Sequence, residues 1–240
     1  MTLDELVTQL RAGYGDALRA VVLYGSAVAG EHIAKRSDYN VFVVVDRIPL
    51  DRLRPLASVT RAWRDAGNPP PMTFTTAEWH GSADVFPMEY ADILERHRLL
   101  FGEDPFAGIK VNRRDLRMQL EHEALGVLLR LRQGVLLAGD DSAAQIKLMA
   151  GSLSSLMIVF RGLVRLHGHT PPSNYTELTS KVAGLVGTAP DPFHDVIAQV
   201  RGERSIRKER ASDILAAYLR GMEAIAAHID ALPTIEEQGD

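Results

Sequence analysis

Short apolar runs and amphipathic stretches alternate along the first part of the chain. Apolar residues recur at helical spacing over residues 3–10, behind a Thr2 that can accept a hydrogen bond from the first turn. This spacing predicts a capped helix that ends near Gly13 and Gly15, where glycine interrupts the pattern.

Four runs that follow have the length and residue types of strands. Residues 17–24 (ALRAVVLY) and 41–45 (VFVVV) are rich in β-branched residues and predict two buried strands. Residues 72–75 and 84–90 predict two more, the last with a proline that suits an edge or a bulge. An amphipathic helix is expected over residues 50–63. Strands interleaved with helices predict an α/β domain.

The pattern changes near Asp104, after which almost every apolar residue follows a helical period. Proline pairs separate the helical stretches. We therefore predict an N-terminal α/β domain over residues 1–106, an all-α bundle of four or five helices over residues 110–232, and a flexible tail over residues 233–240. The helices expected in the bundle cover residues 113–137, 142–167, 193–201 and 212–232.

Composition narrows the functional classes. The net charge of −4 gives no overall positive field that would attract nucleic acid or a membrane surface. The absence of cysteine excludes disulfides, thiolate nucleophiles and cysteine zinc sites. The first residues lack the basic and apolar regions of a signal peptide, and no uncharged apolar stretch reaches the ~18 residues of a membrane span. These features predict a cytoplasmic protein with a small-molecule or protein partner.

A glycine–serine turn is the first feature that suggests chemistry. Gly25 follows a predicted strand, and glycine lets the backbone approach a bulky anion. Ser26 can donate its hydroxyl, and the residues after it can begin a helix with free N–H groups. Such a turn is a suitable phosphate cradle, although Gly–Ser also occurs at ordinary strand–helix junctions.

The segment Ser37-Asp38-Tyr39-Asn40 precedes the second predicted strand. Residues two apart in a strand face the same side, so Asp38 and Asn40 should point together into the space beside Gly25 and Ser26. Two oxygen ligands beside a triphosphate cradle favour Mg²⁺. Alone, the segment would equally fit a capped turn and a satisfied strand edge, but its pairing with Leu23-Tyr24-Gly25-Ser26 favours a functional site.

This order of motifs, with Gly30 between them, resembles the DNA polymerase β-like nucleotidyltransferase superfamily. Within it, the chain is similar to the antibiotic (aminoglycoside and lincosamide) nucleotidyltransferases. The resemblance implies a small mixed sheet followed by a helical bundle. It also implies a Mg²⁺-dependent enzyme that binds ATP or another NTP and transfers a nucleoside monophosphate to a hydroxyl of an acceptor. Gly25, Ser26 and Ser37 would then contact the nucleotide.

The family motif has Asp-x-Asp where this chain has Asp38-Tyr39-Asn40. The resemblance makes Asp38 a metal ligand with a catalytic role and gives Asn40 the second ligand position. Asparagine keeps one carbonyl oxygen but lacks the charge, so metal affinity should fall. Two alternatives therefore stand beside a working enzyme: a catalytically silent nucleotide-binding or regulatory module, and a protein whose bundle binds a partner. The bundle could also form a homodimer.

The family also has a third carboxylate on a later strand, which we expect within residues 84–90. Glu89 is the first choice, as a catalytic base for the acceptor hydroxyl and a possible metal ligand. The alternatives are Asp84, at the start of the predicted strand, and Asp92, in the capping position of a helix expected over residues 93–99.

Other polar features fit simpler interpretations. His122 should lie on a solvated helix face, and the Arg161–His167 spacing only faintly resembles a ribonuclease motif. The mixed-charge run 201–210 should be solvated, although its cations could also contact a triphosphate. Trp63 and Trp79 are expected to be packing residues.

Overall fold

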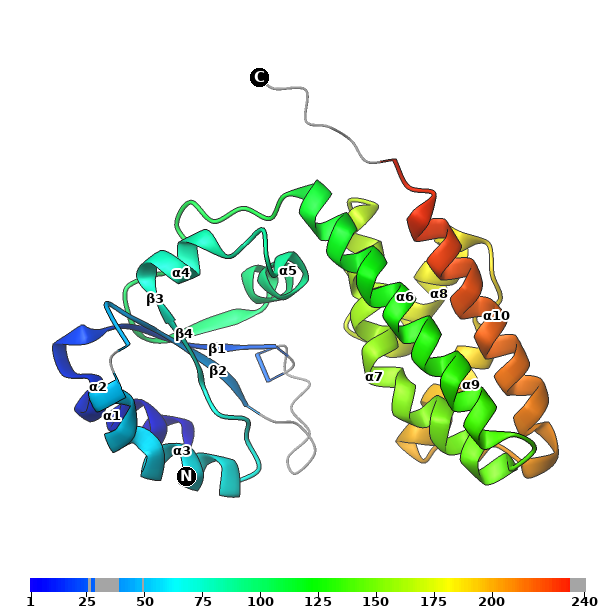
Figure 1. The fold of residues 1–240 in the computed structure, drawn as a ribbon, viewed down its shortest axis with the longest axis horizontal. Helices are drawn as coiled ribbons and strands as arrows, with labels where there is room; N and C mark the ends of the chain where they lie inside the picture. Colours follow the sequence, from blue (N-terminus) through cyan, green and yellow to red (C-terminus); the bar gives the residue numbers. More distant parts are fainter. Residues whose placement is uncertain (26, 29–38, 49, 234–240) are drawn as a thin grey trace. The chain divides into compact units, whose positions relative to one another are not determined.

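The computed structural model describes residues 1–25, 27–28, 39–48 and 50–233. The chain divides into two compact units, Met1–Asn112 and Arg113–Asp240 (Figure 1). The domain limits inferred from the sequence, residues 1–106, 110–232 and 233–240, remain a prediction. The fold class is confirmed, because a small mixed sheet with helices is followed by an all-helical unit.

The first unit contains a four-stranded sheet in the order β3-β2-β1-β4. The central strands, β1 (Leu18–Tyr24) and β2 (Asn40–Val45), are antiparallel to each other and carry the most apolar runs. Strand β3 (Met72–Thr75) lies parallel to β2, and β4 (His97–Gly102) lies antiparallel to β1. Both centre strands are almost fully buried, as expected for strands covered on both faces.

Helices cover both faces of this sheet (Figure 1). On one face, α1 (Leu3–Tyr14) and α3 (Ala57–Asp65) pack against alternate β1 and β2 side chains. On the other face, α4 (Thr76–Gly81) and α5 (Pro87–Glu95) pack against the intervening side chains. A short α2 (Leu50–Leu53) precedes α3.

Two aromatic residues anchor these layers. Trp63 and Trp79 are fully buried, and each indole N–H donates to a backbone carbonyl, that of Pro69 at 3.0 Å and that of Pro105 at 2.8 Å. The Trp79 ring also stacks on Phe42 of β2. The prediction that both tryptophans are packing residues is confirmed.

The predicted strand over residues 84–90 is wrong. Helix α5 begins at Pro87, and the last strand is β4, in a segment where the sequence predicted a helix over residues 93–99. Proline suits the first position of a helix because its φ is already helical and its missing N–H has no partner there. A short apolar run does not by itself distinguish a strand from a buried helix, so periodicity gave the wrong element.

The second unit contains five α-helices among its described residues. The four predicted helices are confirmed, and the structure adds α8. The elements are α6 (Arg113–Ala138), α7 (Ser142–Leu166), α8 (Tyr175–Val186), α9 (Asp191–Arg201) and α10 (Ala211–Asp230). Helix α7 is long and apolar enough to cross a membrane by length and composition, and here it packs against the other four helices.

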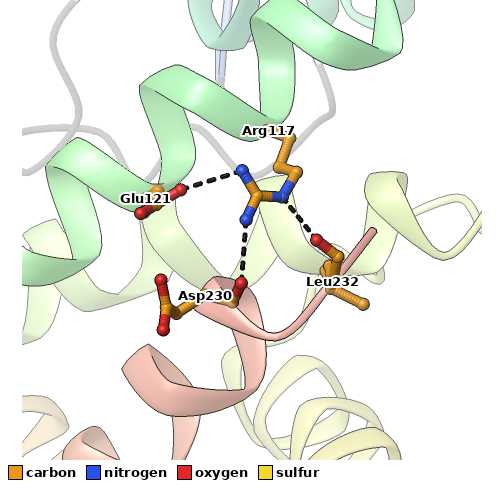
Figure 2. A network of polar contacts seen from close by, with 4 residues as sticks. All are labelled: Arg117, Glu121, Asp230 and Leu232. Carbon is orange, nitrogen blue, oxygen red and sulfur yellow. Dashed lines mark hydrogen bonds and ion pairs between the residues drawn. The ribbon is translucent and has the colours of Figure 1, made fainter. Parts of the chain in front are cut away.

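Arg117 ties the start of α6 to the end of α10 (Figure 2). Its Nε donates to the carbonyl oxygen of Leu232 at 2.8 Å, and one terminal nitrogen donates to that of Asp230 at 2.9 Å. Its other terminal nitrogen pairs with Glu121 at 2.9 Å. The guanidinium therefore satisfies the Asp230 carbonyl, which the C-terminus of α10 leaves without an intrahelical partner, and the Leu232 carbonyl just beyond the helix, and its charge complements the helix dipole.

Candidate functional site

The turn after β1 is the place where the sequence predicted a phosphate cradle, and that role stays a prediction. Gly25 has φ +82°, in the left-handed region that favours glycine. Its N–H donates to the Arg96 carbonyl at 3.1 Å, and its own carbonyl accepts from the Val28 N–H at 3.1 Å. Ser26, the partner predicted for it, lies outside the described residues, as do Ser37, Asp38 and Gly30.

Asn40 lies beside this turn. It begins β2 and pairs with Tyr24, the residue that precedes Gly25. A Cβ at Gly25 would lie 3.4 Å from the Asn40 side-chain nitrogen, so the two residues are neighbours in space. Because alternate strand residues share a face, Asn40 lies on the face of Phe42, which α5 covers.

A buried asparagine that the sequence analysis missed fixes the backbone at this point. The Asn68 side-chain oxygen accepts from the Tyr39 N–H at 2.9 Å. Asn68 itself is only 8% exposed, at the start of the proline-rich break before β3. The only signal in the sequence was an asparagine before three prolines, which indicates a turn and not a partner.

Two carboxylates of α5 lie near the same end of β1. Burial, followed by the negative charges of Glu89 and Asp92, raises the pKa of Tyr24 to about 12. Tyr24 packs against the core cluster that contains Tyr90 and Ile93 of α5, so this helix lies beside it. Glu89 and Asp92 are three residues apart on one helix, so they share a face. The Tyr24 hydroxyl itself also contacts the sulfur of Met72 at 3.9 Å.

The structure corrects the setting of the predicted third carboxylate. Glu89 lies in the first turn of α5, exposed, and not on a strand. Asp92 lies inside α5 and does not cap a helix that begins at residue 93. Asp84 is exposed in the turn before α5. The choice of Glu89 over the other two acids stays a prediction, although Glu89 and Asp92 both act on Tyr24.

His97 shares this end of the sheet, since it pairs with Tyr24 from the other side. Its Nδ1 lies 2.8 Å from the Ile93 carbonyl, so that nitrogen carries the proton and donates. Its ring packs 3.8 Å from that of Phe106. These contacts give His97 a structural role that closes the turn between α5 and β4.

The chemistry of the donors here suits a hard cation. Asn40 offers an amide oxygen, and Glu89 and Asp92 offer carboxylates, the ligand types that Mg²⁺ prefers. Within the residues that the structure describes, no group of three or more acidic or histidine side chains is arranged to hold a metal. The predicted ligand Asp38 lies outside that part of the chain.

Comparison with known proteins gives one informative result. No protein-family model and no curated protein matches the chain. A solved structure does: spectinomycin adenyltransferase AAD(9) from Enterococcus faecialis, solved with ATP and spectinomycin. The match has a TM-score of 0.59 and 12% sequence identity, and covers 93% of this chain and 97% of that one. The chain therefore shares its fold with AAD(9).

The remaining charged candidates have local partners. In the run 201–210, Arg204 pairs with Asp195, and Arg210 lies 3.7 Å from Asp213. These ion pairs lie within the second unit and are largely solvated, as the sequence predicted.

The histidines of the second unit also have simple surroundings. His122 is exposed, as expected. The Nε2 of His167 lies 3.1 Å from the Nε2 of His228, which gives His167 a neighbour in α10.

Proposed function

We propose that this protein is a nucleotidyltransferase, which transfers a nucleoside monophosphate from an NTP to a hydroxyl group of a small acceptor. One observation carries the proposal: the Gly25 turn, Asn40 and the carboxylates of α5 gather around Tyr24 at one end of the sheet. A glycine turn flanked by serine hydroxyls and oxygen ligands suits a triphosphate with its cation. The shared fold with AAD(9) supports the same reading.

Each residue has a role in this proposal. The hydroxyls of Ser26 and Ser37 would bind the phosphates, and Gly25, which has no side chain, would let the phosphates approach the turn closely. Asp38, Asn40 and Glu89 would supply oxygen ligands to Mg²⁺, which when bound neutralises charge on the phosphates. The acceptor oxygen forms a bond to the α-phosphorus while the bond to pyrophosphate breaks.

Glu89 is the proposed base. Its carboxylate would take the proton of the acceptor hydroxyl as that oxygen attacks. Its exposure on the first turn of α5 leaves it accessible from solvent, as a base for an incoming acceptor must be. AAD(9) was solved with ATP and spectinomycin, so we propose ATP as the first NTP to test and hydroxylated small molecules as the acceptor class. The cytoplasm, which supplies ATP and Mg²⁺, is the proposed compartment.

Calorimetric titration with ATP and GTP, with and without Mg²⁺, tests binding, and pyrophosphate release across a panel of hydroxylated acceptors tests turnover. Asp38→Asn should lower Mg²⁺-dependent binding, and Glu89→Gln should lower turnover by about 10²-fold or more while nucleotide binding persists. Asp65→Asn is the matched control, because Asp65 is an exposed acid at the end of α3. Absence of both nucleotide binding and pyrophosphate release would refute the proposal.

Asn40 favours a second candidate, a nucleotide-binding module without turnover. A neutral amide at this position weakens any cation site. Aspartate has nearly the same shape, so Asn40→Asp should fit beside Gly25 without steric conflict. If the rest of the site is competent, this substitution raises Mg²⁺ affinity and pyrophosphate release. If the Asn40→Asp variant binds nucleotide but still releases no pyrophosphate, that result would instead support the nucleotide-binding module without turnover.

A further inference from the structure

A concave site lies within the helical unit, between α6 and α7. Its volume is about 600 Å³, within the range of pockets that bind small molecules. Its walls are mainly aliphatic, with Leu131 and Val127 from α6 and Leu148 from α7. At the rim, Leu137 is 89% exposed, so a large apolar side chain faces solvent at the mouth.

Small residues create this cavity. Gly134 and Ala138 of α6 face Ala144 and Gly151 of α7 across it. At Gly134 a Cβ would collide with the Leu148 side chain, which therefore lies directly against the glycine. At Gly151 a Cβ would meet nothing within 4 Å, so that position borders open space. The cavity thus has one close-packed wall and one unfilled wall.

Two cations line the same cavity, Arg130 from α6 and Lys147 from α7. Neither forms an ion pair within the part of the chain that the structure describes. Elsewhere on α6 arginines do find partners, since Arg132 pairs with Glu223 at 2.8 Å and Arg117 with Glu121 at 2.9 Å. The polar lining residue Ser152 is already bonded to the Tyr218 hydroxyl at 2.8 Å. The charges left for a ligand are therefore both positive.

We propose that this cavity binds a small amphipathic anion, with its apolar body on the aliphatic walls and its anionic group between Arg130 and Lys147. A carboxylate or phosphate forms charge-assisted hydrogen bonds with such cations. A second copy of the chain fits the site less well, because a two-fold interface here would bring the same two cations of both copies together. A membrane surface is flat, whereas this site is concave.

Octanoate, octanol and octyltrimethylammonium, titrated calorimetrically into the full chain, separate the apolar and charge contributions. Octanoate should bind with one site per chain. Octyltrimethylammonium should bind at least about tenfold more weakly than octanoate. Lys147→Glu should weaken octanoate binding by about tenfold and leave octanol binding within about twofold. Lys181→Glu, on α8, is the charge control.

Gly151→Leu tests the location, because the leucine enters the open space of the cavity and suits a helix interior. It should abolish binding of octanoate and octanol. Gly184→Leu is its matched control, since Gly184 is an exposed helical glycine on α8 whose added Cβ also meets nothing. Circular dichroism verifies that both variants are folded. The proposal is overturned if octanoate does not bind, or if octanoate binds the Gly151→Leu variant as tightly as the unmodified protein. Light scattering that shows a dimer dissociated by Gly151→Leu also overturns it.

Discussion

Replacement of Arg117 by methionine should destabilise the helical unit, because the arginine closes the C-terminal end of α10. The substitution keeps most of the apolar stem and removes two charged hydrogen bonds, to the carbonyls of Leu232 and Asp230. The arginine side chain is only 12% exposed, so water does not readily replace it. Hydrogen bonds from charged groups contribute about 1.5–3 kcal/mol each, and carbonyls at a helix end regain some hydration. The i,i+4 pair with Glu121 adds about 0.3–0.5 kcal/mol. We expect a loss of about 2–4 kcal/mol.

Arg132→Met is the matched control. Arg132 also links α6 to α10, through an ion pair with Glu223. Its side chain is 49% exposed and that of Glu223 is 41% exposed. Exposed pairs contribute about 0.2–1 kcal/mol. Any general cost of losing an arginine on α6 therefore appears in both variants, and the difference between them isolates the closure of α10.

The two units carry different spectroscopic signals, so urea unfolding can follow each. Both tryptophans of the chain, Trp63 and Trp79, lie in the first unit, and their fluorescence reports that unit. Far-ultraviolet circular dichroism mainly reports the second, helix-rich unit. The dichroism midpoint should fall clearly more for Arg117→Met than for Arg132→Met. Equal shifts in the two variants would refute the assignment of Arg117 as a stabilising cap.

Three further outcomes are expected. Gly102→Ala should destabilise the first unit by about 3–5 kcal/mol in fluorescence-monitored unfolding, because φ is +88° and a Cβ would collide with the Arg19 carbonyl oxygen; a loss below about 1 kcal/mol would contradict this. The raised pKa of Tyr24 means that its neutral form stabilises the fold and that this stability is lost as pH rises from 10 to about 12; Tyr24→Phe should flatten that decline, and an unchanged alkaline profile would count against it. Burial, followed by the charges of His228 and its neighbours, lowers the pKa of His167 below 6.5. The helical unit should therefore lose stability as pH falls below 6.5, and the His167→Gln variant should lose less. Dichroism-monitored unfolding at several pH values measures this loss, and equal slopes of stability against pH in both proteins would contradict the prediction.

Much of the fold could be predicted because the strongest segments are locally consistent. The runs in β1 and β2 are apolar, β-branched and bounded by glycine or polar residues, so length and composition agree. Helix α8 was missed although Leu178 and Val182 follow a helical period; its buried face also includes Thr179, a polar residue that is 1% exposed. The prediction of a strand over residues 84–90 was wrong because a proline in a short apolar run suits both an edge strand and the start of a helix.

The candidate site divides along similar lines. Gly25 and Asn40 belong to local motifs, and their proximity follows from strand pairing. Glu89 was chosen on an incorrect strand, yet its charge does act at Tyr24. Asn68 could not be assigned a role, because its contact with Tyr39 depends on packing between segments far apart in the sequence.

The order of the strands also bears on how the protein is made. Strand β1 is near the start of the chain, but one of its two neighbours, β4, is the last strand of the sheet to be synthesised. Until His97–Gly102 leaves the ribosome, the apolar β1 has an open edge that another chain can pair with. Long-range pairing of this kind is slow, whereas the helices that follow mostly contact their neighbours in sequence. A nascent chain that stalls before β4 is thus open to aggregation through this edge of β1.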